Sequence, residues 1–245
     1  MILFTYSSDR VSIIIFSPLS IKGGTLIFMP QSSSAGLYEE DAVWFFIAAS
    51  VDSIVHSILL GNSIEIGFSS INEIETSNKI FLKELGEIPT LFAFPYGETT
   101  DEIIELVKEF KFKVAFGQHS GIINETSNMY YLPRFSLNER YGEIDRVKFA
   151  ASSKGLGVYD FIPQNPTIKQ NPPFIGFSLL DDKKVKSLDC FIFDSKGQVD
   201  REIYKFNERI EIRLSRELSP GRSRMNCTVK DGEGNWRWFG HQFYF

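Results

Sequence analysis

The sequence predicts an α/β fold, built on a parallel sheet or barrel, followed by a small all-β domain. Up to about residue 155, short β-rich runs alternate with helical patterns, which is typical of parallel strands joined by right-handed crossovers. From residue 174 to residue 245, alternating apolar runs separated by turn sequences are typical of a sandwich. The proline-rich stretch DFIPQNPTIKQNPPF indicates a linker over about 156–173.

Length and composition are those of an ordinary globular protein. The chain has 245 residues, of which 43% are hydrophobic and 23% charged, and a formal net charge of −5. It carries no basic stripe, so we expect no nucleic-acid partner. The longest apolar window, 42–60, is interrupted by polar residues, and no basic region precedes an apolar run at the N-terminus. We therefore expect no transmembrane segment, no signal peptide and a cytoplasmic location.

Local patterns predict the elements of the first part in order. Apolar or β-rich runs predict strands at 12–16, 25–29, 63–68, 90–94, 113–117 and 130–135. Helical spacing predicts helices at 39–60, 72–85 and 101–110. Acidic residues favour the start of the first helix, Gly86 ends the second, and Thr100 caps the third.

The last part reads as successive strands with turns between them. The runs are FIGFSLL, SLDCFIF, RIEIRLS, SRMNCTV and NWRWFGHQFYF, and the intervening turns contain Ser195-Lys196-Gly197, Ser219-Pro220-Gly221 and Asp231-Gly232-Glu233-Gly234. The two cysteines, Cys190 and Cys227, lie in two of these runs. They either form one disulfide, if the two strands meet, or stay as buried free thiols.

The stretch ELGEIPTLFAFPYGETTDEIIELVKEFKFKVAFGQHSG, followed by YYLPRF, resembles the polysaccharide deacetylase family (carbohydrate esterase family 4). The resemblance runs from about Asn72 to Phe135. It implies an incomplete, distorted (β/α) barrel that removes N-acetyl groups from a cell-wall or surface polysaccharide. In that family, water bound to zinc or another divalent metal attacks the amide. The C-terminal part looks like the β-domain that follows the catalytic domain in some bacterial members.

Five residues take site roles by this resemblance. Tyr96 would offer its backbone N–H to the oxyanion, while Pro95 fixes the turn and Gly97 permits a close approach to the substrate. His119 is the candidate general acid, since imidazole titrates near neutrality. Arg134 would orient the catalytic aspartate or, without one, bind a sugar hydroxyl or carboxylate. Each role has a purely structural alternative. Pro95, Tyr96 and Gly97 would simply form a turn that ends a strand. His119 would be a loop histidine bonded to the backbone, and Arg134 would form a surface salt bridge.

The N-terminal third departs from the family pattern. In ILFTYSSD, Ser7 and Ser8 stand where the family has two aspartates. In SIEIGFSS, Ser69 stands where the family has its first metal-binding histidine. Serine is a poor neutral ligand for zinc, so we expect this chain to bind no metal. Either the protein is a degenerate member, or residues 1–70 represent a damaged reading frame.

Two functional hypotheses follow from these observations. The first is a deacetylase-like hydrolase, for which Asp9, Asp52 and Glu65 remain open as substitute metal ligands. The second is a non-catalytic carbohydrate-binding or assembly protein, a pseudoenzyme. Both hypotheses imply a polysaccharide or oligosaccharide partner. His241 and the nearby tryptophans of the last run either stack on sugar rings or pack in a core.

Overall fold

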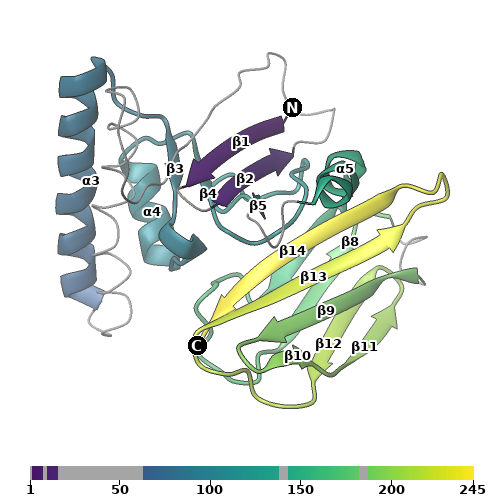
Figure 1. Ribbon diagram of the computed structural model, residues 1–245. Coiled ribbons are helices and arrows are strands. Elements are labelled where there is room, and N and C mark those ends of the chain that lie inside the picture. The colour runs from purple at the N-terminus through teal and green to yellow at the C-terminus, as the bar shows by residue number, and fades with distance from the viewer. Residues whose placement is uncertain (1, 8–9, 16–62, 138–142, 182–186) are drawn as a thin grey trace.

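A computed structural model describes residues 2–7, 10–15, 63–137, 143–181 and 187–245. Helices and short strands lie on one side of the molecule, and a two-sheet β-sandwich lies on the other (Figure 1). The strand predicted at 25–29 and the helix predicted at 39–60 fall outside the described residues, as do Ser8, Asp9 and Asp52. Of the described helices, none is long and apolar enough to cross a membrane.

The predicted (β/α) barrel is wrong. The first part instead contains a three-stranded sheet in the order β1-β2-β5 and a separate pair, β3-β4. Strands β1 (Ile2–Ser7) and β2 (Arg10–Ile15) pair antiparallel along their whole length. Only two residues separate them, which is enough for a hairpin, whereas a parallel neighbour needs a crossover of about a dozen residues or more. Strand β5 (Phe135–Leu137) also pairs antiparallel with β2.

The described residues of this part contain one parallel βαβ unit. Strand β3 (Leu91–Ala93) pairs in parallel with β4 (Val114–Phe116), and helix α4 (Asp101–Glu109) connects them. The predicted cap is confirmed, because the Thr100 hydroxyl accepts a hydrogen bond from the Ile103 N–H at 3.3 Å. The buried face of α4 packs against β3 and against Ile74 of the preceding helix. The βαβ unit thus brings the ends of β3 and β4 together.

The strand predicted at 63–68 is also wrong, because these residues open helix α3 (Ser63–Leu85). In the sequence, Ile64, Phe68, Ile71 and Ile74 recur at spacings of four and three, which suits a helix. The short alternation in SIEIGF predicts a strand only when it is considered apart from the residues that follow. The helix ends where predicted, before Gly86, whose φ of +79° favours glycine.

The sandwich consists of two sheets and draws strands from beyond the expected boundary at residue 174. One sheet has the order β10-β9-β13-β14-β6 and the other has the order β11-β12-β8-β7. Strands β6 (Lys154–Gly155) and β7 (Val158–Ile162) precede or lie within the segment expected to be a linker. The remaining strands are β8 (Ile175–Leu179), β9 (Asp189–Asp194), β10 (Gly197–Val199), β11 (Arg201–Phe206), β12 (Arg209–Leu214), β13 (Arg222–Lys230) and β14 (Trp236–Tyr244).

Inward-facing side chains from both sheets form the largest buried cluster, and the two cysteines belong to it. Cys190 on β9 and Cys227 on β13 lie directly opposite each other in the strand register and form a disulfide. Both residues are fully buried. The strand pairing thus decides between the two alternatives that the sequence left open.

Strand β14 also joins the sandwich to the first part. The Trp238 ring packs edge-on against Phe135 of β5, with ring centroids 5.0 Å apart, and against Phe149 of helix α5 (Ile144–Ser152). Two residues further along β14, Gly240 passes so close to the loop after β4 that an added Cβ would lie 1.7 Å from the Ser120 carbonyl oxygen. We call this contact between β14 and the first part the seam.

Candidate functional site: a cavity at the seam

The Pro95-Tyr96-Gly97 turn follows β3 as a single 3-10 turn, η1 (Pro95–Gly97). Tyr96 has a left-handed φ of 53°, which is uncommon outside glycine. Gly97 has a φ of +73°, and a Cβ there would lie 2.3 Å from the Gln118 nitrogen. Glycine is therefore required at this position, but the group that approaches it closely is the backbone after β4.

The carbonyl groups of this turn bind the sandwich. The Gln242 Nε2 donates a hydrogen bond to the Tyr96 carbonyl at 3.1 Å. The Gly97 carbonyl accepts hydrogen bonds from the hydroxyl groups of Tyr131, at 3.0 Å, and Tyr244. Gln242 and Tyr244 both belong to β14. The turn thus serves as a docking point for the last strand.

The Tyr96 side chain lies on the outside of the seam. It is 46% exposed, and the Arg222 guanidinium stands over its ring at 5.2 Å from the centroid. Arg222 also forms an ion pair with Glu98, with Nε and Oε1 3.3 Å apart. These contacts add a second link between the turn and β13. Neither Tyr96 nor Pro95 lines the cavity described below.

His119 lies just after β4, where the sequence predicts it, but it is buried. The side chain is 3% exposed, and its ring stacks at a tilt on Tyr131, with centroids 4.7 Å apart. Burial, together with the positive charges of Arg134 and Arg224, lowers the pKa of His119 to about 3. The ring is therefore neutral at pH 7, and the proposed general acid would lack its proton there.

Arg134 is buried rather than part of a surface ion pair. Its side chain is 4% exposed, and its Nε donates a hydrogen bond to the Gly117 carbonyl at 2.8 Å. Burial lowers the pKa of Arg134 to about 10, so the guanidinium stays charged at pH 7. Its backbone N–H also donates to the His119 carbonyl at 2.9 Å. The side chain does not line the cavity, and it acts on His119 through its charge.

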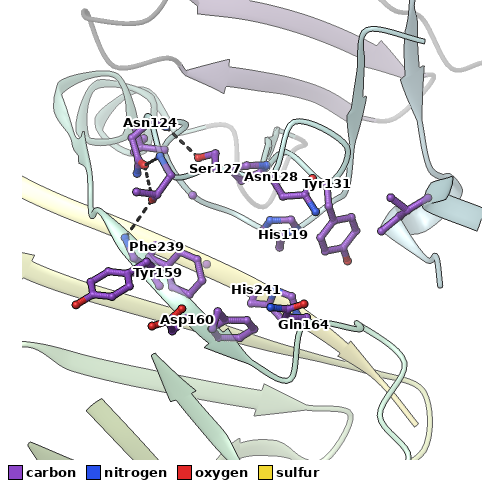
Figure 2. Close-up of a pocket in the computed structure, with 18 of the residues that line it drawn as sticks. His119, Asn124, Ser127, Asn128, Tyr131, Tyr159, Asp160, Gln164, Phe239 and His241 are labelled. Atoms are coloured by element: carbon purple, nitrogen blue, oxygen red, sulfur yellow. Dashed lines mark hydrogen bonds between the residues drawn. The ribbon is translucent and has the colours of Figure 1, made fainter. Parts of the chain in front are cut away.

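The sequence-predicted residues therefore gather around the end of β4, but only His119 reaches a cavity. This cavity has a volume of about 600 Å³ and lies between the first part and the sandwich. Its walls are one face of α4, the loop after β4, strand β7 and the middle of β14. Figure 2 shows part of this lining, with His119 and Tyr131 on one side and Asp160 and His241 on the other. Its polar lining comprises Asp101, Glu105, Lys108, His119, Asn124, Thr126, Ser127, Asn128, Asp160, Gln164 and His241. Its aromatic lining comprises Tyr131, Tyr159, Phe161 and Phe239.

A second buried histidine faces this seam cavity. His241 is 6% exposed and packs against Phe161, with ring centroids 4.4 Å apart. Its ring lies 6.0 Å from the His119 ring, centroid to centroid (Figure 2). Burial, with His119 as a smaller cause, holds the pKa of His241 well below its ordinary value. Both imidazoles are therefore neutral at pH 7.

Neither imidazole has its polar atoms fully satisfied by the part of the chain that the structure describes. His119 Nδ1 and His241 Nε2 are buried and have no hydrogen-bond partner among the described residues. A neutral imidazole carries one donor and one acceptor, and buried polar atoms in proteins are nearly always paired. The two rings line one cavity, but these two nitrogens are themselves closed off from it, so a bound molecule would reach them only if the surrounding side chains shift.

The loop between β4 and β5 holds the cavity wall in place through its own side chains. Asn124 Oδ1 accepts hydrogen bonds from the N–H and hydroxyl of Thr126, at 2.9 and 2.8 Å, and its Nδ2 donates to the Leu156 carbonyl at 3.2 Å. The Thr126 hydroxyl accepts from the Val158 N–H at 3.2 Å (Figure 2). Asn124 is therefore used to tie the loop to β7, whereas the Asn128 amide and Gln164 are better placed to meet a ligand.

The sequence patterns do not predict most of this cavity. They leave His241 as a residue that either stacks on sugar rings or packs in a core. The alternation of β14 places it on the same side as Phe239 and Phe243, which pack with the sandwich core. A histidine at a core-facing position of an apolar alternation is the signal that was available. Asp160 and Gln164 lie in the stretch that was expected to be a linker.

The described residues do not fit the metal centre of the family that the sequence resembles. Within residues 2–7, 10–15, 63–137, 143–181 and 187–245, no group of three or more His, Cys, Asp or Glu side chains comes together as metal ligands. His119 and His241 are paired with aromatic rings rather than with carboxylates. We therefore derive no reaction step through a metal.

The acid sensitivity of folding provides a test of the buried His119. Because its folded pKa is about 3 and its ordinary value is 6.5, the unfolded chain binds the proton first as pH falls. Stability is therefore lost as pH drops from about 6.5 toward 3. When the pH falls from about 7 to about 5, the titration of His119 should lower the free energy of unfolding by about 2 kcal/mol.

Urea unfolding of the native chain and the His119→Gln variant at several pH values between about 7 and 5 measures this effect. Aspartates and glutamates titrate mainly below this window, so they contribute little to the difference. The variant should show the flatter profile. Parallel profiles would mean that His119 titrates normally and is not buried as described.

Comparisons with known proteins do not extend these observations. No family model matches the chain, and no curated protein matches it. Among solved structures, it is similar over 36% of its length to CopC from Methylosinus trichosporium OB3b, of which 90% is covered, at 15% identity and a TM-score of 0.31. The match to PcoC, a copper resistance protein from Escherichia coli, covers 36% of this chain and 93% of PcoC, at 13% identity and a TM-score of 0.29. The match to the Lin-41 filamin domain covers 35% of this chain and 84% of that domain, at 13% identity and a TM-score of 0.26. At these scores the similarities carry no functional argument.

Proposed function

We propose that this protein binds a carbohydrate segment in the seam cavity, without hydrolysing it. The observation that carries this proposal is the pair of neutral, buried imidazoles, His119 and His241, in the wall of one cavity. A neutral imidazole carries one donor and one acceptor, and a sugar hydroxyl is likewise both donor and acceptor. The cavity volume of about 600 Å³ is within the usual range for a small-molecule site.

The remaining lining suits the same class of ligand. Tyr159 and Phe161 of β7 supply aromatic surface against which the C–H faces of a sugar ring can pack. Asn128 uses its Oδ1 to accept a hydrogen bond from the Tyr130 N–H at 2.9 Å, which leaves its NH₂ group as a donor. Gln164 adds a further amide. Few polar groups among apolar rings are typical of a ligand site.

Binding is better supported than hydrolysis by the same residues. Tyr96, whose backbone N–H was the candidate oxyanion donor, does not line the seam cavity. A general acid needs a proton at working pH, whereas the pKa of His119 is about 3. The non-catalytic hypothesis needs only what these residues already offer, namely neutral hydrogen-bonding groups.

Titration calorimetry with neutral oligosaccharides tests the proposal. We expect binding in the native chain and a loss of about fivefold in affinity for His241→Gln, since each hydrogen bond at such a site is worth about 1 kcal/mol. Trp236→Ala is the matched control, because Trp236 lies on the same strand, is 38% exposed and is outside the cavity. The control should bind as the native chain does.

Two results would count against this function. Absence of binding by any neutral oligosaccharide in the native chain would remove the carbohydrate-binding proposal. Release of acetate from an N-acetylated oligosaccharide in the presence of zinc would instead favour the hydrolase that the sequence resembles. That activity should then be lost when a chelator removes the zinc, because in the resembled family a metal activates the attacking water.

A further inference from the structure

Two buried histidines meet across the seam, one from each side. His119 follows β4 in the first part and His241 belongs to β14, and their ring centroids lie 6.0 Å apart (Figure 2). The Tyr131 ring packs on both, at 4.7 Å and 5.8 Å between centroids. Next to His241, Gly240 passes directly against the carbonyl of Ser120, the neighbour of His119. Both rings therefore lie where the backbones of β14 and the first part come together.

In the closed seam, neither ring can accept a second proton without leaving an N–H unpaired. His119 Nδ1 and His241 Nε2 are buried and lack a hydrogen-bond partner in the part of the chain that the structure describes. The Gly117 backbone closes the space beside His119 Nδ1, since an added Cβ there would lie 2.8 Å from this nitrogen. A protonated imidazole carries an N–H on both nitrogens, and an unpaired buried donor is costly. The closed seam therefore holds both rings in the neutral form.

The charges that act on the pair also oppose protonation. The buried Arg134 and the exposed Arg224 both act on His119, and the two rings act on each other. The remaining rings that pack on His241 belong to phenylalanines. Further charged side chains around the seam are Asp101, Glu105, Lys108 and Asp160, which line the cavity, and Glu98 with its ion-pair partner Arg222. The pKa of neither histidine is raised by a carboxylate among the described residues.

We propose that the seam opens in acid: protonation of His119 and His241 below about pH 6 releases β14 from the first part while the sandwich stays folded. This inference concerns the seam itself and holds whatever occupies the cavity. In the open form, water reaches both rings, so each takes up a proton near its ordinary pKa of 6.5, whereas burial keeps both pKa values low in the closed form. Lowering the pH from about 7 to about 5 therefore favours the open form by about 25-fold for each histidine and about 600-fold for both.

Two features keep the sandwich folded over this pH range. The Cys190–Cys227 disulfide joins β9 to β13 within its core. Asp194 accepts hydrogen bonds from Arg216 at 2.6 and 3.0 Å, and this partner holds the pKa of Asp194 well below its ordinary value, so the ion pair persists at about pH 5. Because the cavity walls come from both sides of the seam, opening would take the cavity apart and leave the sandwich core in place.

Thiol labelling measures how often the seam opens. In a Gln242→Cys variant the new thiol lies in the seam, because Gln242 is fully buried and donates a hydrogen bond to the Tyr96 carbonyl. The labelling rate with dithiodipyridine at low concentration is divided by the rate of the same variant unfolded in urea at the same pH. This ratio reports the opening equilibrium, and we expect it to be about 600-fold larger at about pH 5 than at about pH 7.

Val199→Cys is the matched control. Val199 is fully buried in the sandwich core on β10, an edge strand that β9 and β13 separate from β14. Its ratio should change by less than about threefold, since carboxylates titrate mainly below this pH range. An increase at Val199→Cys equal to that at Gln242→Cys would overturn the inference, because acid would then act on the whole protein. An unchanged ratio at Gln242→Cys would overturn it as well.

A second pair of variants tests the assignment to the two histidines. Adding His119→Gln or His241→Gln to the Gln242→Cys protein removes one titrating ring. The increase on going from about pH 7 to about pH 5 should then fall to about 25-fold. Either variant is sufficient if the other does not fold. An increase that stays as large as in the Gln242→Cys protein would overturn the assignment to this pair.

Discussion

Reduction of the Cys190–Cys227 disulfide is expected to lower the free energy of unfolding by about 4 kcal/mol. The bridge joins residues 37 apart in sequence, and chain-entropy arguments give this magnitude for a loop of that length. It links β9 and β13, adjacent strands of the five-stranded sheet, and lies within the sandwich core. For a protein of ordinary stability, this loss would be a large fraction of the total.

Chemical denaturation of the oxidised and reduced protein measures the difference, and a Cys190→Ala, Cys227→Ala variant provides a form that cannot reoxidise. Titration of free thiols supplies an independent readout, because the chain has only 2 cysteines. The unfolded, unreduced protein should show no free thiol. Two titratable thiols before reduction would show that the bridge does not form.

The same measurement bears on the compartment in which the protein works. Structural disulfides persist in oxidising environments and are rare in the cytosol. A stabilising bridge between Cys190 and Cys227 would therefore weigh against the cytoplasmic location expected from the sequence. If the protein isolated from its own cells carries free thiols, the cytoplasmic expectation stands.

Replacement of Gly240 by alanine is expected to destabilise the protein by about 3 kcal/mol, the upper part of the usual range for overpacking. The added Cβ would lie 1.7 Å from the Ser120 carbonyl oxygen, which is backbone and cannot rotate away. Either β14 or the loop after β4 must move. Because β14 also carries Gln242 and Tyr244 to the Pro95–Gly97 turn, such a shift would weaken those hydrogen bonds too.

The matched control for this prediction is Gly232→Ala. Gly232 lies in the turn between β13 and β14, and a Cβ there would meet nothing within 4 Å. It should change stability by less than about 0.5 kcal/mol. Thermal unfolding of the two variants beside the native chain makes the comparison. Equal effects would mean that β14 does not pass against Ser120 and that the seam is arranged differently.

Gly240→Ala also separates the fold of the sandwich from the integrity of the cavity. Gly240 lies opposite Asn226 in the strand register, next to Cys227. Neighbouring residues of a strand point to opposite faces of the sheet, so the disulfide on the core face should still form. The walls of the seam cavity, in contrast, come from both sides of the seam. A folded Gly240→Ala protein should therefore bind oligosaccharide more weakly than Gly232→Ala does.

Local sequence signals were sufficient for those elements that depend on neighbouring residues. Thr100 caps α4, Gly86 ends α3, and the five alternating runs of the last part all form strands. Each of these outcomes depends on contacts within a few residues along the chain, or on an alternation that faces one core. The helix at 144–152 was missed, because its short apolar pattern carries no strong cap: Glu143 makes no side-chain capping bond.

The arrangement of strands was not available from such signals. Alternation of strands and helices favoured a barrel, yet β1 and β2 form a hairpin and β5 joins them antiparallel. Whether two runs pair, and in which direction, depends on residues more than a hundred positions apart, as for β2 and β5. The resemblance around Pro95-Tyr96-Gly97 located the ends of β3 and β4 but gave a misleading view of what the turn contacts.

By itself, then, the sequence determined the βαβ unit around the Pro95-Tyr96-Gly97 turn, the strand content of the last part and the presence of His119 at a strand end. The tertiary structure alone decided that Cys190 faces Cys227, that β14 docks on the turn, and that His241 meets His119 across a cavity. The reason is physical. Hydrogen bonds within a turn are set by adjacent residues, whereas the burial that neutralises two histidines arises only when distant strands close around them.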